Sequence, residues 1–299
     1  MIAAALDLGS NTLRLLVAQV DGGEYLDLER GLASPRLGRG LRPGQPLDPT
    51  ARQAARIQAH EFVARARALG AQRIALAATQ ACRVASDGDQ FVAQLGRELG
   101  LQAATVLDGQ AEAELSRTGI LSRLRGPALG AVLADVGGGS TEAAALDGDW
   151  ALSLPMGAVS LTEAHLAGDP PSTAEMASLA HAVELGLEPL ANVPARRLVA
   201  TAGTAATVGA LLLGMTHYQA GLVNNLEVSR EQLEQQLARL ATLPLAERKL
   251  LPGLEPERAD IILAGMAILR GLLLVLQLEN MTVMDAGLLE GILLRLAAA

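Results

Sequence analysis

Apolar runs separated by polar, glycine-containing turns open the chain. These runs cover residues 2–8, 13–20 and 25–28, and Asp21-Gly22-Gly23 stands between the second run and the third. Short apolar runs bounded by turn residues predict buried strands, and an Asp-Gly dipeptide between two of them predicts a hairpin. The chain is therefore expected to begin with three strands, the first two joined by a polar glycine loop.

A long amphipathic stretch comes next, and its ends carry helix signals. Asp48 and Pro49 are typical of the cap and the first position of a helix, and Gly70 is typical of a stop after Leu69. Strand-like and helix-like patterns then alternate to the end of the chain. Further strands are predicted at 73–78, 103–107, 130–134, 143–146, 150–154, 197–201 and 281–284. Further helices are predicted at 87–99, from 110 onward, and at 172–190, 202–213, 229–241, 244–250, 256–277 and 287–297.

The two halves of the chain repeat one pattern. The segment Asp7-Leu-Gly-Ser-Asn-Thr12 is similar to Asp135-Val-Gly-Gly-Gly-Ser-Thr141, and each follows one predicted strand and precedes another. In both halves a proline–glycine loop, a long helix and a short strand follow, the short strand beginning at Arg73 or Arg197. Hairpin strands followed by helix–strand units predict a mixed sheet flanked by helices.

The repeat predicts an α/β protein of two domains. The first domain would cover residues 1–120 and the second residues 121–299, with the last helix able to pack back on the first domain. The pattern resembles the actin, sugar-kinase and heat-shock ATPase superfamily. That resemblance implies two actin-like (ribonuclease H-like) domains, each a mixed β-sheet flanked by helices, with a cleft between them.

The two glycine loops carry the candidate chemistry. Glycines allow tight turns, and successive backbone N–H groups in such turns form concave anion sites. Asp135 and Glu142 flank the second loop and would repel an anion unless a cation lay between them. Asp7 precedes the first loop, and carboxylates together with phosphate oxygens suit Mg²⁺. The candidate phosphate-binding residues in the loops are Gly9, Ser10, Asn11, Thr12, Gly137, Gly138, Gly139, Ser140 and Thr141.

The charge balance narrows the class of partner. The net charge is -8, which argues against a general nucleic-acid or anionic-membrane binder. Within this acidic chain, the glycine-rich segment 34–44 holds Arg36, Arg39 and Arg42 as a local basic patch. Such a patch could steer a polyanion toward the protein, although a solvated loop is equally expected from the sequence. A single cysteine fits a reducing compartment.

One apolar segment, residues 261–278, needs a separate interpretation. Arg270 near its middle would be costly at the centre of a bilayer, by about 2.5–3.5 kcal/mol. We therefore expect a helix buried between the two domains and no membrane contact. The N-terminus lacks the basic start of a signal peptide and reaches Asp7 early, so a cytoplasmic protein is expected.

Six motifs in this order resemble the exopolyphosphatase / guanosine pentaphosphate phosphatase family, in its short two-domain form. Together they span essentially the whole chain. They are Asp7–Thr12, Ala78-Thr-Gln-Ala-Cys-Arg83, Gly109-Gln-Ala-Glu-Ala113, Asp135–Glu142, Arg258-Ala-Asp260 with Ala264-Gly-Met-Ala-Ile268, and Gly287-Leu-Leu-Glu-Gly291.

The resemblance implies a phosphoanhydride hydrolase that releases terminal orthophosphate from inorganic polyphosphate. It implies that Glu112 is the general base that activates water, with Glu114 the alternative if the motif aligns differently. It implies that Arg83, and also Arg14, bind phosphate. By the same resemblance Mg²⁺, or another divalent cation, would be held directly or through water by three carboxylates. These belong to Asp7, Asp135 and Glu142.

Several alternatives stay open on the sequence. The substrate could instead be guanosine pentaphosphate, hydrolysed by the same chemistry. The protein could also be a nucleotide- or polyphosphate-binding regulator with little turnover, or, less favoured, a kinase. Cys82 beside Arg83 is a possible nucleophile, but it has no histidine near it in sequence. The four histidines show no metal-ligand spacing, and the apolar C-terminal helices allow a homodimer.

Overall fold

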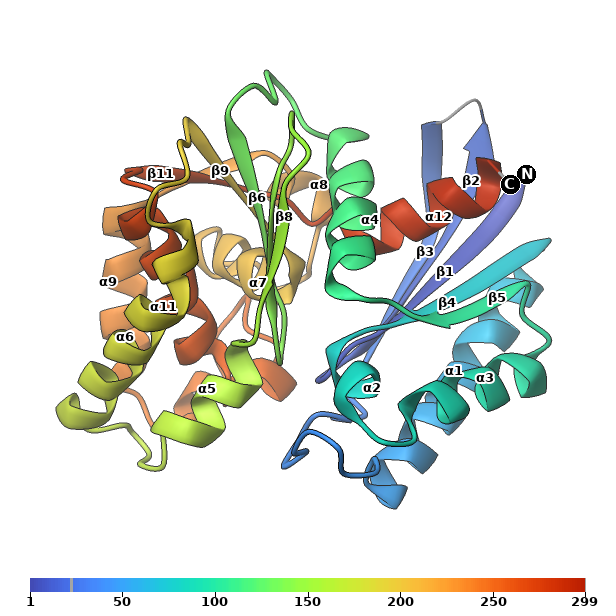
Figure 1. Cartoon of the computed structure of the whole chain (residues 1–299), viewed down its shortest axis with the longest axis horizontal. Helices are drawn as coiled ribbons and strands as arrows, with labels where there is room; N and C mark the ends of the chain where they lie inside the picture. The colour runs from blue at the N-terminus through green and yellow to red at the C-terminus, as the bar shows by residue number, and fades with distance from the viewer. Residues whose placement is uncertain (22–23, 299) are drawn as a thin grey trace. The chain divides into compact units, whose positions relative to one another are not determined.

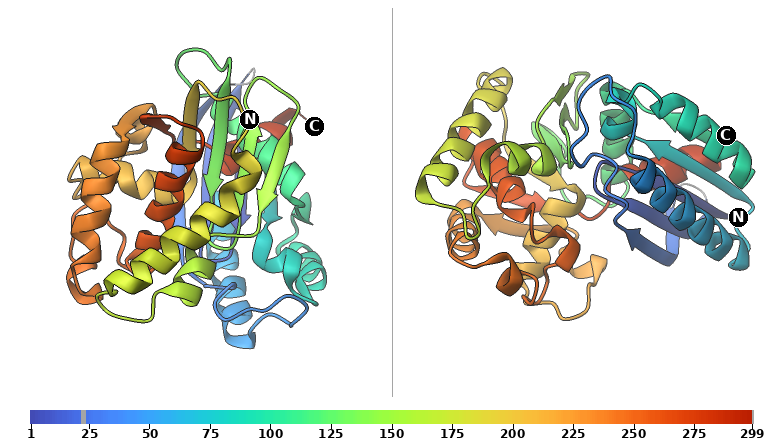
Figure 2. Two further views of the ribbon diagram at one scale, coloured as in Figure 1. Left: turned by 60° about the vertical axis from the view of Figure 1, so that its left-hand side comes forward. Right: turned by 90° about the horizontal axis from the view of Figure 1, so that it is seen from below.

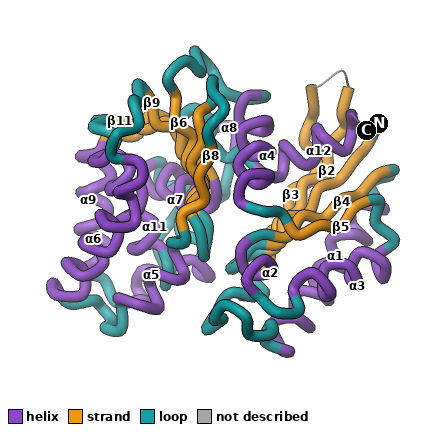
Figure 3. The backbone as a smooth tube through the Cα atoms, in the orientation of Figure 1, coloured by secondary structure: helices purple, strands orange, loops and turns teal. Residues whose placement is uncertain are grey.

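The computed structural model describes residues 1–21 and 24–298, and these form two compact units. Unit 1 comprises Met1–Ser122 with Gly287–Ala299, and unit 2 comprises Arg123–Ala286. Each unit holds one mixed β-sheet flanked by helices (Figures 1 and 3). The predicted α/β class with two such domains is confirmed, whereas the cleft between them stays a prediction. The last helix belongs to unit 1.

The sheet of unit 1 has five strands in the order β3-β2-β1-β4-β5. β1 is antiparallel to β2 and parallel to β4, so the sheet is mixed. The predicted Asp-Gly turn between β2 and β3 falls on residues 22 and 23, which lie outside the described residues. The strands are β1 (Ile2–Leu8), β2 (Leu13–Asp21), β3 (Glu24–Ala33), β4 (Arg73–Ala78) and β5 (Ala103–Val106).

Helices cover both faces of this sheet (Figures 1 and 2). On one face the core includes Phe62 of α1 and Phe91 of α3, and on the other it includes Leu115 of α4 and Leu293 of α12. Asp48 caps α1 as predicted, because its Oδ1 accepts a hydrogen bond from Ala51 N at 2.9 Å. The helices are α1 (Pro49–Ala68), α2 (Gln80–Val84), α3 (Gly88–Leu99), α4 (Gly109–Leu121) and α12 (Leu288–Ala298).

The sheet of unit 2 has six strands in the order β10-β11-β9-β6-β7-β8. They are β6 (Ala131–Val136), β7 (Thr141–Ala145), β8 (Ala151–Leu154), β9 (Arg197–Thr201), β10 (Leu226–Ser229) and β11 (Asn280–Val283). The α-helices are α5 (Ala158–His165), α6 (Thr173–Leu187), α7 (Ala202–Leu212), α8 (Ala220–Val223), α9 (Arg230–Ala241), α10 (Leu245–Arg248) and α11 (Ile262–Val275). Two 3₁₀ turns cover Glu188–Leu190 and Pro256–Arg258.

The internal repeat is visible in the topology and in the register. Read from its other end, the second sheet runs β8-β7-β6-β9-β11, which matches β3-β2-β1-β4-β5 strand for strand. The parallel pair β1–β4 sets Ala3 opposite Arg73, and the parallel pair β6–β9 sets Ala131 opposite Arg197. Both units are therefore built on the same supersecondary arrangement, and β10 is an extra edge strand of unit 2.

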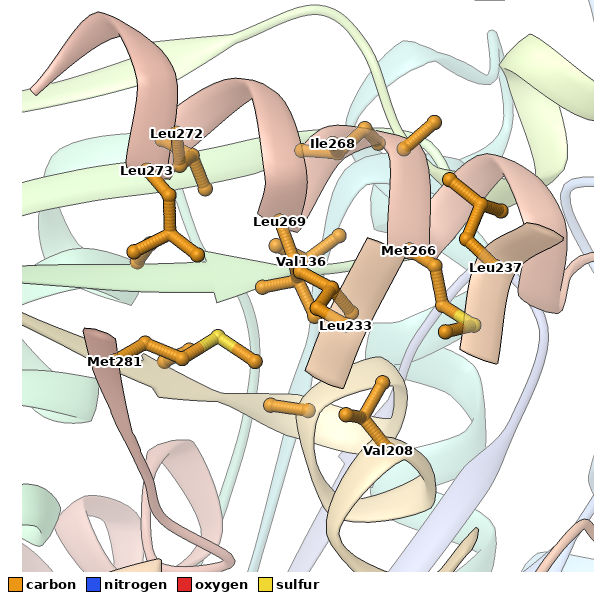
Figure 4. Close-up of a cluster of buried hydrophobic side chains, with 14 of the residues drawn as sticks. Val136, Val208, Leu233, Leu237, Met266, Ile268, Leu269, Leu272, Leu273 and Met281 are labelled. Atoms are coloured by element: carbon orange, nitrogen blue, oxygen red, sulfur yellow. The ribbon is translucent and has the colours of Figure 1, made fainter. Parts of the chain in front are cut away.

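The long apolar segment forms α11, and its predicted position between the domains is wrong. α11 lies inside unit 2, where Leu269, Leu272 and Leu273 pack with Val136 of β6 and Met281 of β11 (Figure 4). The helix is apolar on nearly all sides because the sheet covers one side and helices α5, α6 and α9 cover the others. Within the described part of the chain, no helix is both long enough and apolar enough to span a membrane.

Candidate active site

The first phosphate-loop candidate joins β1 to β2. Gly9 N donates to Thr12 O at 2.9 Å, which closes a tight four-residue turn. The carbonyl groups of Ser10 and Asn11, inside this turn, accept hydrogen bonds from the protein. Ser10 O accepts from Gly38 N at 2.8 Å, and Asn11 O accepts from Arg36 N at 3.1 Å. Ser10 Oγ also donates to Gln80 Oε1 at 3.0 Å, which ties the loop to α2. The loop is thus fixed with its carbonyls in use, as an anion-binding turn requires.

The second loop joins β6 to β7 and closes in the same way. Gly137 N donates to Ser140 O at 3.0 Å. Its carbonyls are also in use, since Gly137 O accepts from Ala158 N at 2.9 Å and Gly138 O accepts from Val159 N at 2.7 Å. Among the described residues, the amides of Gly138 and Gly139 find no acceptor. These two N–H groups are therefore available to an anion.

Two hydroxyl groups of this loop have different surroundings. Thr141 is fully buried on β7, and its Oγ1 donates to Met156 O at 2.8 Å. Its single hydroxyl proton is thus used to fix the loop, and the sequence alone did not indicate this role. Ser140, by contrast, makes no side-chain hydrogen bond with any residue that the structure describes. Its hydroxyl can donate to a ligand.

The loop closure leaves the two predicted metal ligands of unit 2 side by side. Asp135 on β6 stands directly opposite Glu142 on β7, so both side chains lie on the same face of the sheet. This face is opposite to the one that carries Ala134 and Val136 into the core. Asp135 is 8% exposed and Glu142 is 1% exposed. Two buried carboxylates at one place need a neutralising partner.

The strand register places two more polar residues beside Asp135 and Glu142, and the sequence did not indicate them. Ser153 on β8 stands opposite Glu142, and Thr201 on β9 stands opposite Asp135. Ser153 Oγ donates to Glu142 Oε1 at 2.8 Å, which holds the carboxylate in place. Thr201 Oγ1 donates to Ala286 O at 2.7 Å. Only the register shows these partners, because Ser153 is a lone polar residue in a short strand.

The matching position in unit 1 has a different charge. Asp7 stands opposite Arg14 across β1 and β2, where unit 2 has an acid opposite an acid. Asp7 lies on the same face of β1 as Ala3 and Ala5, which pack with residues of α4 and α12. The two loops therefore close through the same backbone hydrogen bond, but the residue opposite the aspartate is Arg14 in unit 1 and Glu142 in unit 2.

Glu112 and Arg83 form an ion pair in unit 1. Asp108 Oδ1 caps α4 by accepting from Ala111 N at 2.7 Å, and Glu112 follows in the first turn. Arg83 Nη1 donates to Glu112 Oε2 at 2.9 Å and to Leu107 O at 2.8 Å. Glu112 is only 6% exposed. The structure thus brings together the proposed base and a proposed phosphate ligand from two separate motifs.

The alternative base, Glu114, is placed differently. It is exposed on the outer side of α4, and its Oε1 accepts from Gln110 Nε2 at 3.2 Å. Its neighbours within the helix are the ordinary i,i+4 partners of a surface residue. The surroundings of the two glutamates therefore favour Glu112 as the reactive carboxylate.

The donor set for a metal is composed of oxygen atoms. Over residues 1–21 and 24–298, no group of three or more His, Cys, Asp and Glu side chains is arranged to hold an ion. Mg²⁺ needs few protein ligands, because waters and substrate phosphates complete its shell. The carboxylates of Asp135 and Glu142, buried and facing each other, fit such an ion by their chemistry.

Cys82 is not suited to nucleophilic catalysis in this structure. It is buried, and burial, with a smaller contribution from Asp87 and Asp89, raises the pKa of its thiol to about 12. A thiol with this pKa is protonated near neutral pH and is a poor nucleophile. Among the histidines, His165 Nδ1 lies 2.9 Å from Ser178 Oγ on the protein surface.

Comparisons with known proteins agree with these features. The model of the Ppx/GppA phosphatase family matches residues 16–299. "Exopolyphosphatase 2" of Mycobacterium tuberculosis is 34% identical over 312 aligned residues, which cover 98% of both chains. An uncharacterized protein of Streptomyces coelicolor is 31% identical over 99% of this chain and 90% of its own. The crystal structure of the Aquifex aeolicus member of the Ppx/GppA family superposes with a TM-score of 0.82 at 26% identity, covering 100% of this chain and 98% of the other.

Proposed function

Because the chain belongs to the Ppx/GppA phosphatase family, we propose that it hydrolyses the terminal phosphoanhydride bond of inorganic polyphosphate and releases orthophosphate. The observation that carries this proposal is the pair of Glu112 and Arg83. Arg83 fixes the carboxylate of Glu112, and a planar guanidinium also suits phosphate oxygens. Within unit 1, Glu112 as the proton acceptor therefore lies in contact with Arg83 as the phosphate-binding group.

The reaction proceeds by attack of water on the terminal phosphorus. Glu112 accepts one proton from the water while the water oxygen bonds to phosphorus. The bridging P–O bond breaks, its electron pair stays on the shortened polyphosphate, and orthophosphate leaves. Backbone N–H groups of the glycine loop at residues 9–12, which lies in the same unit as Glu112, hold phosphate oxygens during this step. A positioned general base of this kind contributes about 10²–10⁴-fold to the rate.

Asp135 and Glu142 would hold the divalent cation, for which Mg²⁺ is the expected identity. When bound, the cation offsets negative charge on the phosphate oxygens. Ser153 supports this role, because its hydrogen bond fixes one oxygen of Glu142. The N–H groups of the second loop would thus contact the anionic substrate directly, whereas Asp135 and Glu142 would contact it through the cation.

Phosphate release by the purified protein tests the proposal. With Mg²⁺ present, the wild type is expected to release orthophosphate from polyphosphate. Glu112→Gln keeps the shape of the side chain and should lower the rate by about 10²–10⁴-fold. Glu114→Gln is the matched control, since it makes the same change two residues away on the exposed side of α4. Full activity of Glu112→Gln would exclude Glu112 as the base.

A parallel assay on guanosine pentaphosphate decides the substrate class. A higher kcat/KM for polyphosphate supports the proposal, and a higher value for the nucleotide would assign the protein to the alternative phosphohydrolase activity. Binding of polyphosphate with no release of phosphate from either compound would instead identify a binding protein with little turnover.

A further inference from the structure

The segment that holds Arg36, Arg39 and Arg42, residues 36–42, is attached to the first glycine loop. Gly38 N donates to Ser10 O, and Arg36 N donates to Asn11 O. A Cβ on Gly38 would lie 2.8 Å from Ser10 Cβ, so the close approach requires glycine here. Arg39 follows directly, which places its Cα about 3.8 Å from that of Gly38. We call residues 36–42 the basic segment.

The basic segment is held in one conformation at several points. Leu37 is buried in the core of unit 1. Farther along, Gly44 N donates to Val84 O at 2.8 Å, next to Arg83 on α2. Arg36 adopts a left-handed backbone with φ of 57°, which costs a non-glycine residue roughly 1–2 kcal/mol. A strained backbone conformation persists only where the surrounding contacts hold it, so the basic segment has a defined conformation.

Unit 2 provides an internal comparison for the arginines. There the corresponding proline–glycine loop contacts the second glycine loop through Ala158 N and Val159 N. No lysine or arginine occurs anywhere from residue 126 to residue 195. Backbone amides alone are therefore enough to attach such a loop, and the arginines of the basic segment are not needed for that purpose.

The guanidinium groups of Arg39 and Arg42 have no partner among residues 1–21 and 24–298. Both side chains are exposed, and neither forms a hydrogen bond or an ion pair with another residue of the described chain. No Asp or Glu occurs from residue 30 to residue 47. The arginines Arg52, Arg56 and Arg65 of the same unit pair with carboxylates instead. A free double positive charge beside a phosphate loop, in a chain with a net charge of -8, suits a second anion.

We propose that Arg39 and Arg42 form a subsite for phosphate groups of the polyphosphate chain beyond those held at residues 9–12. The subsite gives the protein a preference for long chains over short ones. This proposal rests on the proposed polyphosphate hydrolysis. It adds the place at which the uncleaved part of the polyphosphate binds. The contacts are between guanidinium groups and phosphate oxygens, so they depend on ionic strength.

The test compares substrates of two lengths with the double variant Arg39→Gln/Arg42→Gln. For long-chain polyphosphate, kcat/KM should fall about tenfold through a higher KM, and kcat should stay within about twofold. For tripolyphosphate, kcat/KM should stay within about twofold. The dependence of log KM on log salt for long chains should become less steep, by up to about one for each arginine.

A matched control removes the same two charges elsewhere. Arg97 and Arg295 are exposed residues of unit 1, and their side chains make no hydrogen bond or ion pair with other residues that the structure describes. Arg97→Gln/Arg295→Gln should leave the length preference unchanged. An equal loss in the control, or an equal loss on both substrate lengths in the Arg39/Arg42 variant, would overturn the subsite.

A binding measurement separates the subsite from the proposed function. Equilibrium binding of long-chain polyphosphate is measured in the Glu112→Gln background, with and without the Arg39/Arg42 substitutions. A roughly tenfold weaker binding supports the subsite even if the wild type hydrolyses nothing, in which case only the proposed function fails. Unchanged binding removes the subsite while hydrolysis by the wild type still stands.

Discussion

Substitution of Gly119 by alanine tests how α12 is attached to unit 1. A Cβ at this position of α4 would lie 2.8 Å from Gly291 N and 2.9 Å from the carbonyl carbon of Gly287, and closer still to Gly287 O. All three atoms belong to the backbone of the α12 segment, so no side chain can rotate away. Gly291 meets α4 in the same way, because a Cβ on it would overlap with Leu115 O.

The expected cost follows from two opposing terms. Alanine in a helix interior is normally better than glycine by about 0.8–1 kcal/mol. Overpacking of a rigid contact costs about 1–3 kcal/mol. Gly119→Ala should therefore lower the free energy of unfolding of unit 1 by up to about 2 kcal/mol, and with a urea m-value of about 2 kcal/mol/M this lowers the midpoint by up to about 1 M. Phosphate release should fall as well, because α4 carries Glu112 in its first turn.

Urea denaturation followed by circular dichroism measures the shift. Gly221→Ala is the matched control, since a Cβ there has no atom within 4 Å and α8 gains only the helix preference of alanine. This control should be as stable as the wild type or slightly more so. If Gly119→Ala behaved like Gly221→Ala, the close backbone packing of α4 and α12 would not be present in solution.

Three further changes have expected outcomes. Ser153→Ala removes the hydrogen bond to Glu142 and should raise the Mg²⁺ concentration for half-maximal binding by about tenfold, measured by calorimetry; unchanged binding would mean that Glu142 needs no such support. Hydrogen bonds from Ser172, and from Gly168 and Ala167, lower the pKa of the partly exposed Glu175 carboxylate to about 2. The stabilisation from this carboxylate is therefore complete above the unfolded pKa of about 4.3 and is lost as the pH falls through about 2, so Glu175→Gln should lower the melting temperature at pH 7 and much less at pH 2. Cys82, whose pKa is about 12, should react with iodoacetamide at pH 8 only after denaturation; rapid labelling of the native protein would contradict its burial.

The sequence predicted the features that depend on local pattern. All the strands except the edge strand β10, together with α1, follow from short apolar runs, turn residues and the cap at Asp48, all of which act between near neighbours. The duplicated loops were also predicted, because their glycines and aspartates recur in the same order. The short α8 was not predicted, since its four residues lie in a stretch without clear periodicity.

Features that depend on distant partners were not predictable in the same way. The position of α11 was misjudged because a helix that is apolar all round shows no preferred side, so its pattern cannot distinguish the core of one unit from an interface. Ser153 was missed because only the register of β7 and β8 sets it opposite Glu142. The pairing of Arg83 with Glu112 likewise joins two motifs that were recognised separately.

The duplication gives two loops of equal backbone geometry and unequal chemistry. In unit 2 the aspartate faces Glu142, and two carboxylates at neighbouring positions repel each other unless a cation or proton lies between them. In unit 1 the aspartate faces Arg14, so that pair already carries both signs. The segment after the third strand differs in the same sense, since it is basic in unit 1 and without basic residues in unit 2. Under the proposed function, the carboxylates of unit 2 would hold the cation, and unit 1 would supply the base and the basic segment.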